Sequence, residues 1–359
     1  MRSKARDLGA FFIREWLLSI SAIGIVAASL YLQSWPAYRF SQIVPILLLF
    51  FLFVAVRGIE RSGLLTSFAH YLEGGRWLAP KIVLLTFLLS IFLSIDVTLV
   101  TLLPLVLAMR IENRERLFLL VAFTAHAGAA LTPFGTPQNL FIFSFYHLQI
   151  LPFLRTIAPF SLGLSLLFLL VSFFIATPPR ILEEGAVRKR VDLRQGVLFL
   201  GMLVLVVLAV LHLLPWYTGA IVPLFALFYD RKSLEVDYAL LATFLLFLGL
   251  ANQMKVILAP ELSHPVHLFI LSSVLSQAIS NVPTTLLLHQ FTANWQALLW
   301  GTNVGGFGTP VAALANLIAW RIYASDTSAD HDDSFIWEMI FWGFVVYAIG
   351  VVFYFTTLF

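Results

Sequence analysis

The sequence contains no cysteine and little charge, and each of these absences excludes several classes of protein. Without cysteine the chain has no disulfide, no thiolate nucleophile and no thiolate ligand for a metal or for arsenic. Only 11% of its 359 residues are charged and 60% are hydrophobic, so the polar side chains are too few to cover a water-soluble core. We therefore expect most of the chain to be surrounded by lipid.

The positive residues indicate a membrane orientation and not a nucleic-acid surface. The net charge is +3, but Lys and Arg lie in short loops between apolar runs instead of along one face. Basic residues from Arg2 to Arg14 precede the first apolar run, at 16–33, which is long and is followed by further runs. We expect an uncleaved first span in the cell (inner) membrane, a cytoplasmic amino terminus and no nucleic-acid partner.

Apolar runs near the length of a bilayer crossing predict an all-α polytopic membrane protein with about nine spans and two re-entrant hairpins. The run at 82–109 is too long for one span and too short for two, and basic loops lie on both sides of it, which favours a hairpin. The predicted spans are 16–33, 42–59, 157–176, 197–215, 217–229, 238–254 and 336–356; the hairpins are 82–109 and 266–291; the helices broken in mid-membrane are 117–150 and 295–323.

Two stretches of the sequence, 126–139 and 303–316, align without a gap. The aligned pairs are Gly128 with Gly305, Thr132-Pro133 with Thr309-Pro310, and Asn139 with Asn316; upstream, Ser94 to Thr98 aligns with Ser280 to Thr284. Counting crossings from a cytoplasmic amino terminus makes the second hairpin enter from the side opposite to the first. We therefore predict two inverted repeats, 1–176 and 217–359, joined by a cytoplasmic linker and connecting span at 177–216.

The two Thr-Pro pairs, Thr132-Pro133 and Thr309-Pro310, suit the start of a half-helix inside the bilayer. A threonine hydroxyl caps free amides, and proline is tolerated at the first helical position. The free N–H groups of a half-helix attract an anion, while Asn, Ser and Thr oxygens and free carbonyls ligate a small cation. One such pair alone would be a simple kink, whereas two aligned pairs favour a functional site.

The candidate binding residues come from the two hairpin tips and the two breaks, where the sequence has no Lys or Arg. They are Ser94, Asp96, Thr98, His126, Thr132, Gly135, Thr136, Asn139, Ser280, Asn281, Thr284, Asn303, Thr309 and Asn316. A sodium ion is expected near Ser280, Asn281, Thr309 and Asn316. We expect no catalytic residue, and no cofactor apart from a coupling H⁺ or Na⁺.

Asp96 and His126 are the titratable members of this set. A charged side chain at bilayer depth costs roughly 2.5–3.5 kcal/mol on insertion scales, so an aspartate there favours a function. The simpler alternative for Asp96 is a cap on the second hairpin helix, and that for His126 is packing between helices. If they are functional, both can carry a proton, and His126 is the better suited near neutral pH.

At these residues the sequence resembles the ion-transporter superfamily that includes citrate-transporter-like proteins, divalent anion/sodium symporters, arsenite permeases and one class of sodium/proton antiporters. The resemblance covers nearly the whole chain, and its most specific parts are the Ser-Asn-Val-Pro segment from Ser280 to Pro283 and the two Thr-Pro breaks. It implies a scaffold domain, a mobile transport domain with elevator-like movement and, often, a homodimer.

The first repeat departs from the pattern of that superfamily. Ile95 and His126 stand where the superfamily usually has Asn, whereas Asn281 and Asn303 are present in the second repeat. A sodium site in the first repeat would lose two amide ligands, so we hypothesise that this repeat couples transport to protons through Asp96 or His126.

These features favour an ion-coupled secondary transporter of a small anion, either a carboxylate or an oxyanion, with that anion, the coupling cation and the lipid bilayer as its partners. A sodium/proton antiporter with Asp96 as the exchanged carboxylate is the main alternative, and an arsenite or antimonite efflux permease is a third. We do not expect an enzyme, because the sequence has no HExxH motif, no paired carboxylates and no Ser-His-Asp arrangement.

Overall fold

The computed structural model describes residues 16–65, 67, 77–109, 113–175, 191–258, 262–326 and 334–358. Within these ranges the regular structure is entirely helical and no strand is present. Helices are expected because hydrocarbon offers no hydrogen-bond partner, so each apolar segment has to satisfy its own backbone. The predicted all-α polytopic membrane protein is confirmed.

The helices follow the predicted apolar runs closely. The first half contains α2 (Trp16–Leu32), α3 (Phe40–Arg61), α5 (Leu78–Phe92), α6 (Ile95–Ala108), α7 (Arg114–Ala129), α8 (Pro137–Phe145) and α9 (Ile150–Ser172). The second half contains α10 (Leu193–Val210), η1 (Trp216–Ala220), α11 (Ile221–Tyr229), η2 (Arg231–Leu234), α12 (Tyr238–Leu258), α13 (Pro265–Ile279), α14 (Asn281–Leu288), η3 (His289–Phe291), α15 (Trp295–Val304), η4 (Pro310–Ala312), α16 (Leu314–Ala324) and α17 (Ser334–Leu358).

Among the described residues, five helical segments are long and apolar enough to cross a membrane: α3, α9, α10, α12 together with η2, and α17. The segment predicted as a span at 217–229 is shorter, because it consists of η1 and the nine-residue α11. These two helices nevertheless return the chain to the end of α3, where Arg61 Nε donates to Asp230 Oδ2 at 2.7 Å.

Two predicted boundaries shift. The predicted broken helix ends with α8 at Phe145, not at 150, and α9 begins at Ile150 instead of 157. Of the predicted linker and connecting span, residues 177–190 lie outside the described residues.

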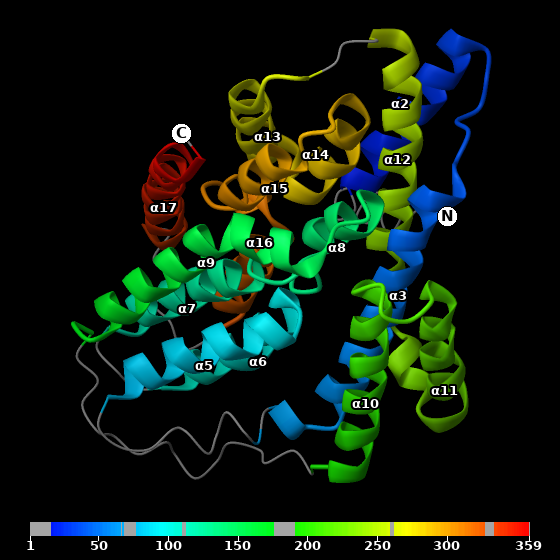
Figure 1. Ribbon diagram of the computed structural model, residues 1–359. Coiled ribbons are helices and arrows are strands. Elements are labelled where there is room, and N and C mark those ends of the chain that lie inside the picture. Colours follow the sequence, from blue (N-terminus) through cyan, green and yellow to red (C-terminus); the bar gives the residue numbers. More distant parts are fainter. Residues whose placement is uncertain are drawn as a thin grey trace, which may run out of the picture.

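The helices form two neighbouring groups (Figure 1). The column, as we name it here, consists of α2 packed against α12 and of α3 packed against α10 and α11. The second group consists of α5 to α9 and α13 to α17. Contacts of α8 with α3 and of α14 with α12 join the two groups.

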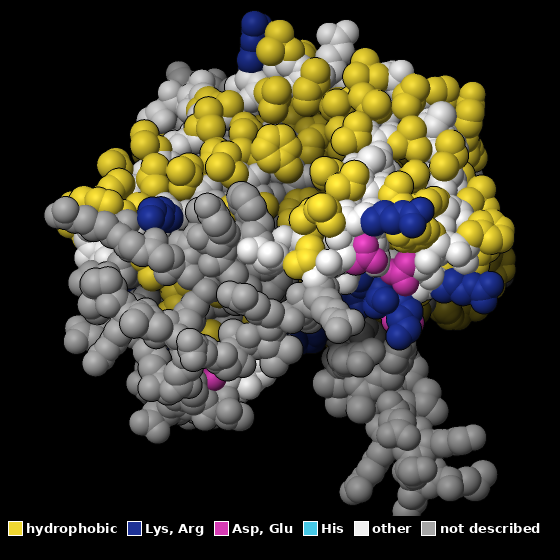
Figure 2. All heavy atoms as spheres, turned by 90° about the horizontal axis from the view of Figure 1, so that it is seen from below, with side chains coloured by type: hydrophobic (Ala, Val, Ile, Leu, Met, Phe, Trp, Pro, Cys, Tyr) yellow, Lys and Arg dark blue, Asp and Glu magenta, His cyan; other side chains and the backbone are white. Residues whose placement is uncertain are grey.

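Charged side chains gather below the column, on the lower face of the molecule (Figure 2). Asp230 lies at the centre of this cluster: it accepts from Arg61 of α3, from Gln195 Nε2 of α10 at 3.0 Å, and from Ser233 Oγ of η2 at 2.7 Å. Gln195 Nε2 also donates to the carbonyl oxygen of Gly58 at 3.3 Å. One carboxylate therefore links α3, α10 and η2.

Candidate functional site

The predicted first hairpin is two helices separated by a short non-helical tip. α5 ends at Phe92, and α6 begins at Ile95 with Ser94 in the N-cap position. Asp96 lies in the first turn of α6. The backbone N–H of Ile95 donates to the carbonyl oxygen of Gly135 at 3.1 Å, so this tip is bonded to the break between α7 and α8.

The first break runs from the end of α7 to the start of α8, and its half-helix begins four residues later than the sequence predicted. We predicted that Thr132-Pro133 opens the half-helix; this is wrong, because α8 begins at Pro137 and its cap is Thr136, whose Oγ1 accepts from the N–H of Asn139 at 3.4 Å. A helix opening at Pro133 would have placed Pro137 in its interior, where proline lacks the donor and clashes with the carbonyl four residues earlier.

The amide of Asn139 spans this break. Its Nδ2 donates to the carbonyl oxygens of Ala130 at 2.9 Å and Thr132 at 3.3 Å. Gly135 passes so close to α7 that a Cβ at this position would overlap the backbone of Ala129. The break is therefore a specific, hydrogen-bonded turn.

The tip between α13 and α14 has a strained backbone at Ser280. This residue has φ of 73° and ψ of 153°, a region that is normally restricted to glycine and costs of order 1–3 kcal/mol. The strain allows α14 to begin directly at Asn281. Both Ser280 and Asn281 are buried, at 6% and 2% exposure.

The second break is held by Gln277, a residue that the sequence did not single out. Its Nε2 donates to the carbonyl oxygens of Gly305 at 2.8 Å and Phe307 at 2.9 Å, and its Oε1 accepts from the N–H of Thr309 at 3.0 Å. Its carboxamide thus replaces hydrogen bonds that the broken helix has lost. The only signal in the sequence is an amide side chain three residues before Ser280, within an apolar run.

Thr309 and Asn316 also stabilise the second break. Thr309-Pro310 opens only the short η4, and the α-helix α16 begins at Leu314. Asn316 Nδ2 donates to the carbonyl oxygens of Gly306 at 2.9 Å and Thr309 at 3.1 Å, which is the counterpart of Asn139 binding Thr132. The prediction of a half-helix at Thr309 is therefore right for a 3₁₀ turn and wrong for the α-helix.

Matching positions of the two aligned segments make matching contacts. Thr132 Oγ1 donates to the carbonyl oxygen of Ile91 at 3.0 Å, and Thr309 Oγ1 donates to that of Gln277 at 2.9 Å. Each acceptor lies three residues before the tip serine of its own hairpin. The opposite membrane orientation of the two repeats, and the re-entrant path of each hairpin, stay predictions.

Both tips and both breaks contribute to the lining of one small cavity of about 70 Å³. Five predicted site residues line it: Asp96, His126, Thr136, Ser280 and Asn281. Gln138, Val311, Ala313 and Leu314 also line it, and the column contributes Trp16, Leu17, Leu240 and Thr243. No Lys or Arg is among the described residues around it.

The other nine predicted residues do not line this cavity. They are Ser94, Thr98, Thr132, Gly135, Asn139, Thr284, Asn303, Thr309 and Asn316. Their side-chain hydrogen bonds are made to the tips, to the breaks or to the helices in which these residues lie. For example, Thr98 Oγ1 donates to Ser94 O at 3.3 Å, and Thr284 Oγ1 donates to Ser280 O at 2.8 Å. A sodium ion near Ser280, Asn281, Thr309 and Asn316 stays a prediction.

His126 and Asn303 occupy aligned positions but differ in their contacts. Asn303 Nδ2 donates to Asn139 Oδ1 at 2.8 Å and so joins the two breaks. His126 is 2% exposed; its ring nitrogens have no side-chain partner, and the backbone of Asn303 lies beside the ring. Its ring lies 4.5 Å from that of Phe307, between centroids, and close to Gly306, where a Cβ would overlap the ring. His126 is thus a buried imidazole that lines the cavity and has no side-chain hydrogen bond.

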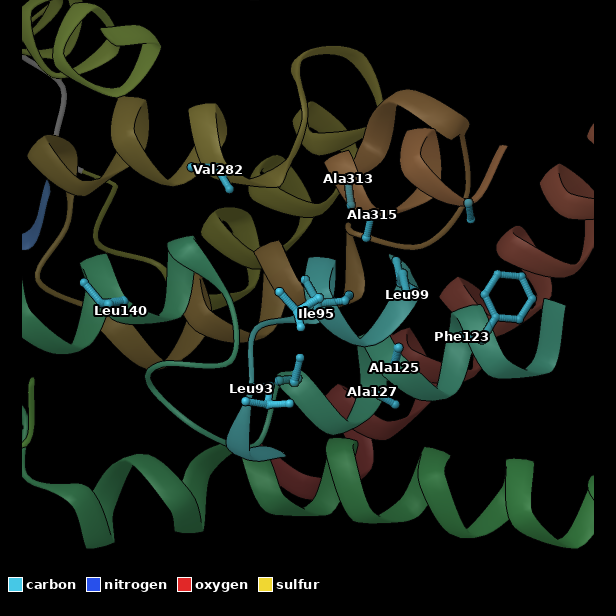
Figure 3. Close-up of a cluster of buried hydrophobic side chains, with 14 of the residues drawn as sticks. Leu93, Ile95, Leu99, Phe123, Ala125, Ala127, Leu140, Val282, Ala313 and Ala315 are labelled. Atoms are coloured by element: carbon cyan, nitrogen blue, oxygen red, sulfur yellow. The ribbon is translucent and has the colours of Figure 1, made fainter. Parts of the chain in front are cut away.

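Small and branched apolar side chains fill the space between the broken segments (Figure 3). Leu93 and Ile95 come from the first tip, Ala125 and Ala127 from α7, and Ala313 from the second break, and all are buried. The alanines allow the backbones to approach closely, as small residues do in membrane helix packing.

Comparison with known proteins points to transporters. A family model described as citrate transporter matches residues 9–302. An uncharacterized transporter of Methanocaldococcus jannaschii is 32% identical over 289 residues, which cover 76% of this chain and 79% of that protein. The inner membrane protein YbiR of Escherichia coli K12 is 32% identical over 336 residues, which cover 88% of this chain and 86% of that protein.

Proposed function

The chain belongs to the citrate transporter family, and from this membership we propose that it is an ion-coupled secondary transporter of a small carboxylate or oxyanion across the cytoplasmic membrane. The observation that carries the proposal is the cavity, which is lined by both tips and both breaks. Such a convergence of interrupted helices is how secondary transporters build their solute sites.

The anion would be bound by helix ends and neutral polar groups. α8, α14 and α16 begin at the cavity with Pro137, Asn281 and Leu314, and the amino end of a helix carries a partial positive charge. Asp96 brings a negative charge to the same cavity. An anion is therefore bound more readily when a proton or a sodium ion enters with it, which is a physical basis for coupling.

Protons are the coupling ions that the first repeat supports best. Asp96 and His126 both line the cavity, and His126 occupies the position where the second repeat has the amide of Asn303. An imidazole binds a proton in place of the sodium ion that an amide oxygen would ligate.

The movement would be elevator-like. The cavity lies at the contact between the second group, which supplies the tips and breaks, and the column, which supplies Trp16, Leu17, Leu240 and Thr243. Sliding the second group along the column would carry the solute from one side of the membrane to the other while its site stays intact.

Transport currents test the proposal. Purified protein in liposomes would be exposed to dicarboxylates, citrate, sulfate, phosphate and arsenite, with sodium present, with sodium absent and at stepped pH. We expect a current evoked by one of the carboxylates or oxyanions that persists without sodium. An arsenite-evoked current alone would identify an efflux permease for that oxyanion, and the absence of any anion-evoked current or uptake would refute the proposal.

A sodium/proton antiporter is the second candidate, and it is favoured by one observation. Asp96 is the only carboxylate among the described residues that line the cavity, and no Lys or Arg accompanies it there. A carboxylate of this kind can exchange a proton for a sodium ion. In the same liposomes, proton movement driven by a sodium gradient, with no response to any anion, would favour this candidate.

A further inference from the structure

The carboxyl end of α8 is closed by a histidine in an unusual backbone conformation. The N–H of His147 donates to Ser144 O at 3.3 Å, and the N–H of Leu148 donates to Phe143 O at 3.0 Å. These two bonds form a Schellman motif, in which the residue after the cap, here His147, adopts a left-handed conformation and is usually glycine. His147 has φ of 49°.

α10 ends in the same way. The N–H of His212 donates to Ala209 O at 3.2 Å, the N–H of Leu213 donates to Leu208 O at 2.9 Å, and His212 has φ of 58°. A left-handed conformation costs a residue with a Cβ roughly 1–2 kcal/mol, a cost that glycine avoids. Histidine therefore occupies two equivalent positions at helix ends where the backbone conformation favours glycine.

The rings of His147 and His212 lie close together in the lining of one cavity of about 570 Å³. Their centroids are 5.8 Å apart and their planes are inclined by 47°. Phe143 stacks on His212 at 5.5 Å with 10° between the planes, which fixes the ring of His212. Two imidazoles that bind one tetrahedral zinc ion, with Zn–N bonds of about 2.0–2.1 Å, have centroids about 5–6 Å apart, which is the separation of these two rings.

The local electrostatics favour a cation at this position. Both histidines follow the carboxyl end of a helix, which carries a partial negative charge. Both side chains are exposed, so an ion can reach them.

Another histidine pair in the described chain provides a natural comparison. His264 and His267 have ring centroids 4.6 Å apart, but they lie at the amino end of α13, where the partial charge is positive. The rings of His264 and His267 are thus about as close as those of His147 and His212, but the helix end beside them has the opposite partial charge.

We propose that His147 and His212 bind a transition-metal dication, for which Zn²⁺ is the reference ion. No group of three or more histidine and carboxylate side chains that could hold a metal occurs in the described ranges, so water completes the coordination. α8 belongs to the second group and α10 to the column, so a bound ion would fasten one group to the other at this point.

Zn²⁺ binding to the purified full-length protein tests the proposal, measured by calorimetry or by competition with a chromogenic chelator. The informative variants are His147→Gly and His212→Gly, because glycine suits both backbone positions and preserves the fold. We expect each variant to bind Zn²⁺ at least tenfold more weakly than the natural chain, and to unfold at the same temperature or higher when no metal is present.

His264→Gly is the matched control, and we expect it to leave the affinity unchanged. Binding that survives in either of the first two variants, or that is lost in His264→Gly instead, would overturn the assignment. So would the absence of measurable binding to the natural chain at micromolar Zn²⁺.

Discussion

At the scale of single residues, the two aligned positions His126 and Asn303 carry different chemistry. Asn303 Nδ2 donates to Asn139 Oδ1, whereas the buried ring nitrogens of His126 have no side-chain partner and only the backbone of Asn303 beside them. A buried polar group whose hydrogen bonds are incompletely satisfied costs the fold free energy, and the protein retains this one beside the cavity. A group that is costly to the fold and lies at the proposed solute site is a strong candidate for binding the coupling proton.

Replacing His126 with asparagine should alter the ion coupling. Asparagine does not titrate near neutral pH, and it supplies the amide oxygen that Asn303 has at the aligned position. We expect His126→Asn to lose part of the pH dependence of transport and to gain stimulation by sodium. Uptake in liposomes, measured across pH with and without sodium, checks this.

His264→Asn is the control for that experiment, because His264 is exposed and does not line the cavity. It should keep the pH profile of the natural chain. An unchanged profile in His126→Asn would instead mean that His126 only packs between helices.

At the scale of elements, each helix break depends on side chains that replace missing backbone bonds. Asn139 spans the first break, and Gln277 and Asn316 span the second. Glycine matters where two backbones meet, as at Gly135 against Ala129. The breaks are therefore as specifically determined as the helices that flank them.

Adding one methyl group at the first break should damage it. In Gly135→Ala the new Cβ would overlap the backbone of Ala129, so the break has to shift. We expect a loss of about 1–3 kcal/mol in the free energy of unfolding, and a larger proportional loss of transport, because the cavity is lined by the adjoining Thr136. Unfolding in mixed micelles and uptake in liposomes measure the two effects.

Gly201→Ala is the matched substitution, since a Cβ at Gly201 of α10 meets nothing within 4 Å. It should be neutral or stabilising by up to about 1 kcal/mol, as alanine favours helix. Equal damage from the two substitutions would show that close approach at Gly135 is unimportant.

Much of this architecture could be predicted from the sequence because lipid imposes a simple rule on apolar runs. The position of the tip at Ser280 and of both breaks followed from short local patterns. The start of α8 was not predicted correctly, because Thr132-Pro133 and Thr136-Pro137 both suit a helix start. The first pair is excluded because a helix that began there would contain Pro137 in its interior. Gln277 escaped notice because its partners lie 28 to 32 residues away in the sequence.

At the scale of the whole molecule, the charge cluster around Asp230 determines how the column responds to acid. Burial alone would raise the pKa of Asp230, but hydrogen bonds from Arg61 and Ser233 and the charge of Arg61 outweigh it and lower the pKa. A lowered folded-state pKa contributes stability that is complete above the unfolded value of about 3.9 and is lost as the pH falls through the folded value.

Asp230→Asn should therefore destabilise the protein by about 1 kcal/mol at neutral pH, and by less below about pH 4. Chemical unfolding at pH 7 and at pH 3 measures the difference. Glu60→Gln is the control, because Glu60 pairs with Arg57 within α3 only and should cost about 0.3 kcal/mol. A penalty for Asp230→Asn that is the same at both pH values would contradict the pairing.

The predicted orientation can be read directly, since the natural chain has no cysteine to react in the background. Gln149 and Lys232 are both exposed, and the predicted topology places Gln149 outside and Lys232 inside. A membrane-impermeant maleimide on intact cells should label Gln149→Cys and should label Lys232→Cys only after permeabilisation. The reverse pattern would invert the topology.

The bond from Asn303 to Asn139 has an evolutionary consequence. It joins side chains 164 positions apart, one from each half of the chain, so neither half can drift freely at this point. Among relatives, residues at these two positions should change together. Asn316 donates its amide only to backbone carbonyls of its own half and is free of this coupling, so substitutions there should show no correlated partner.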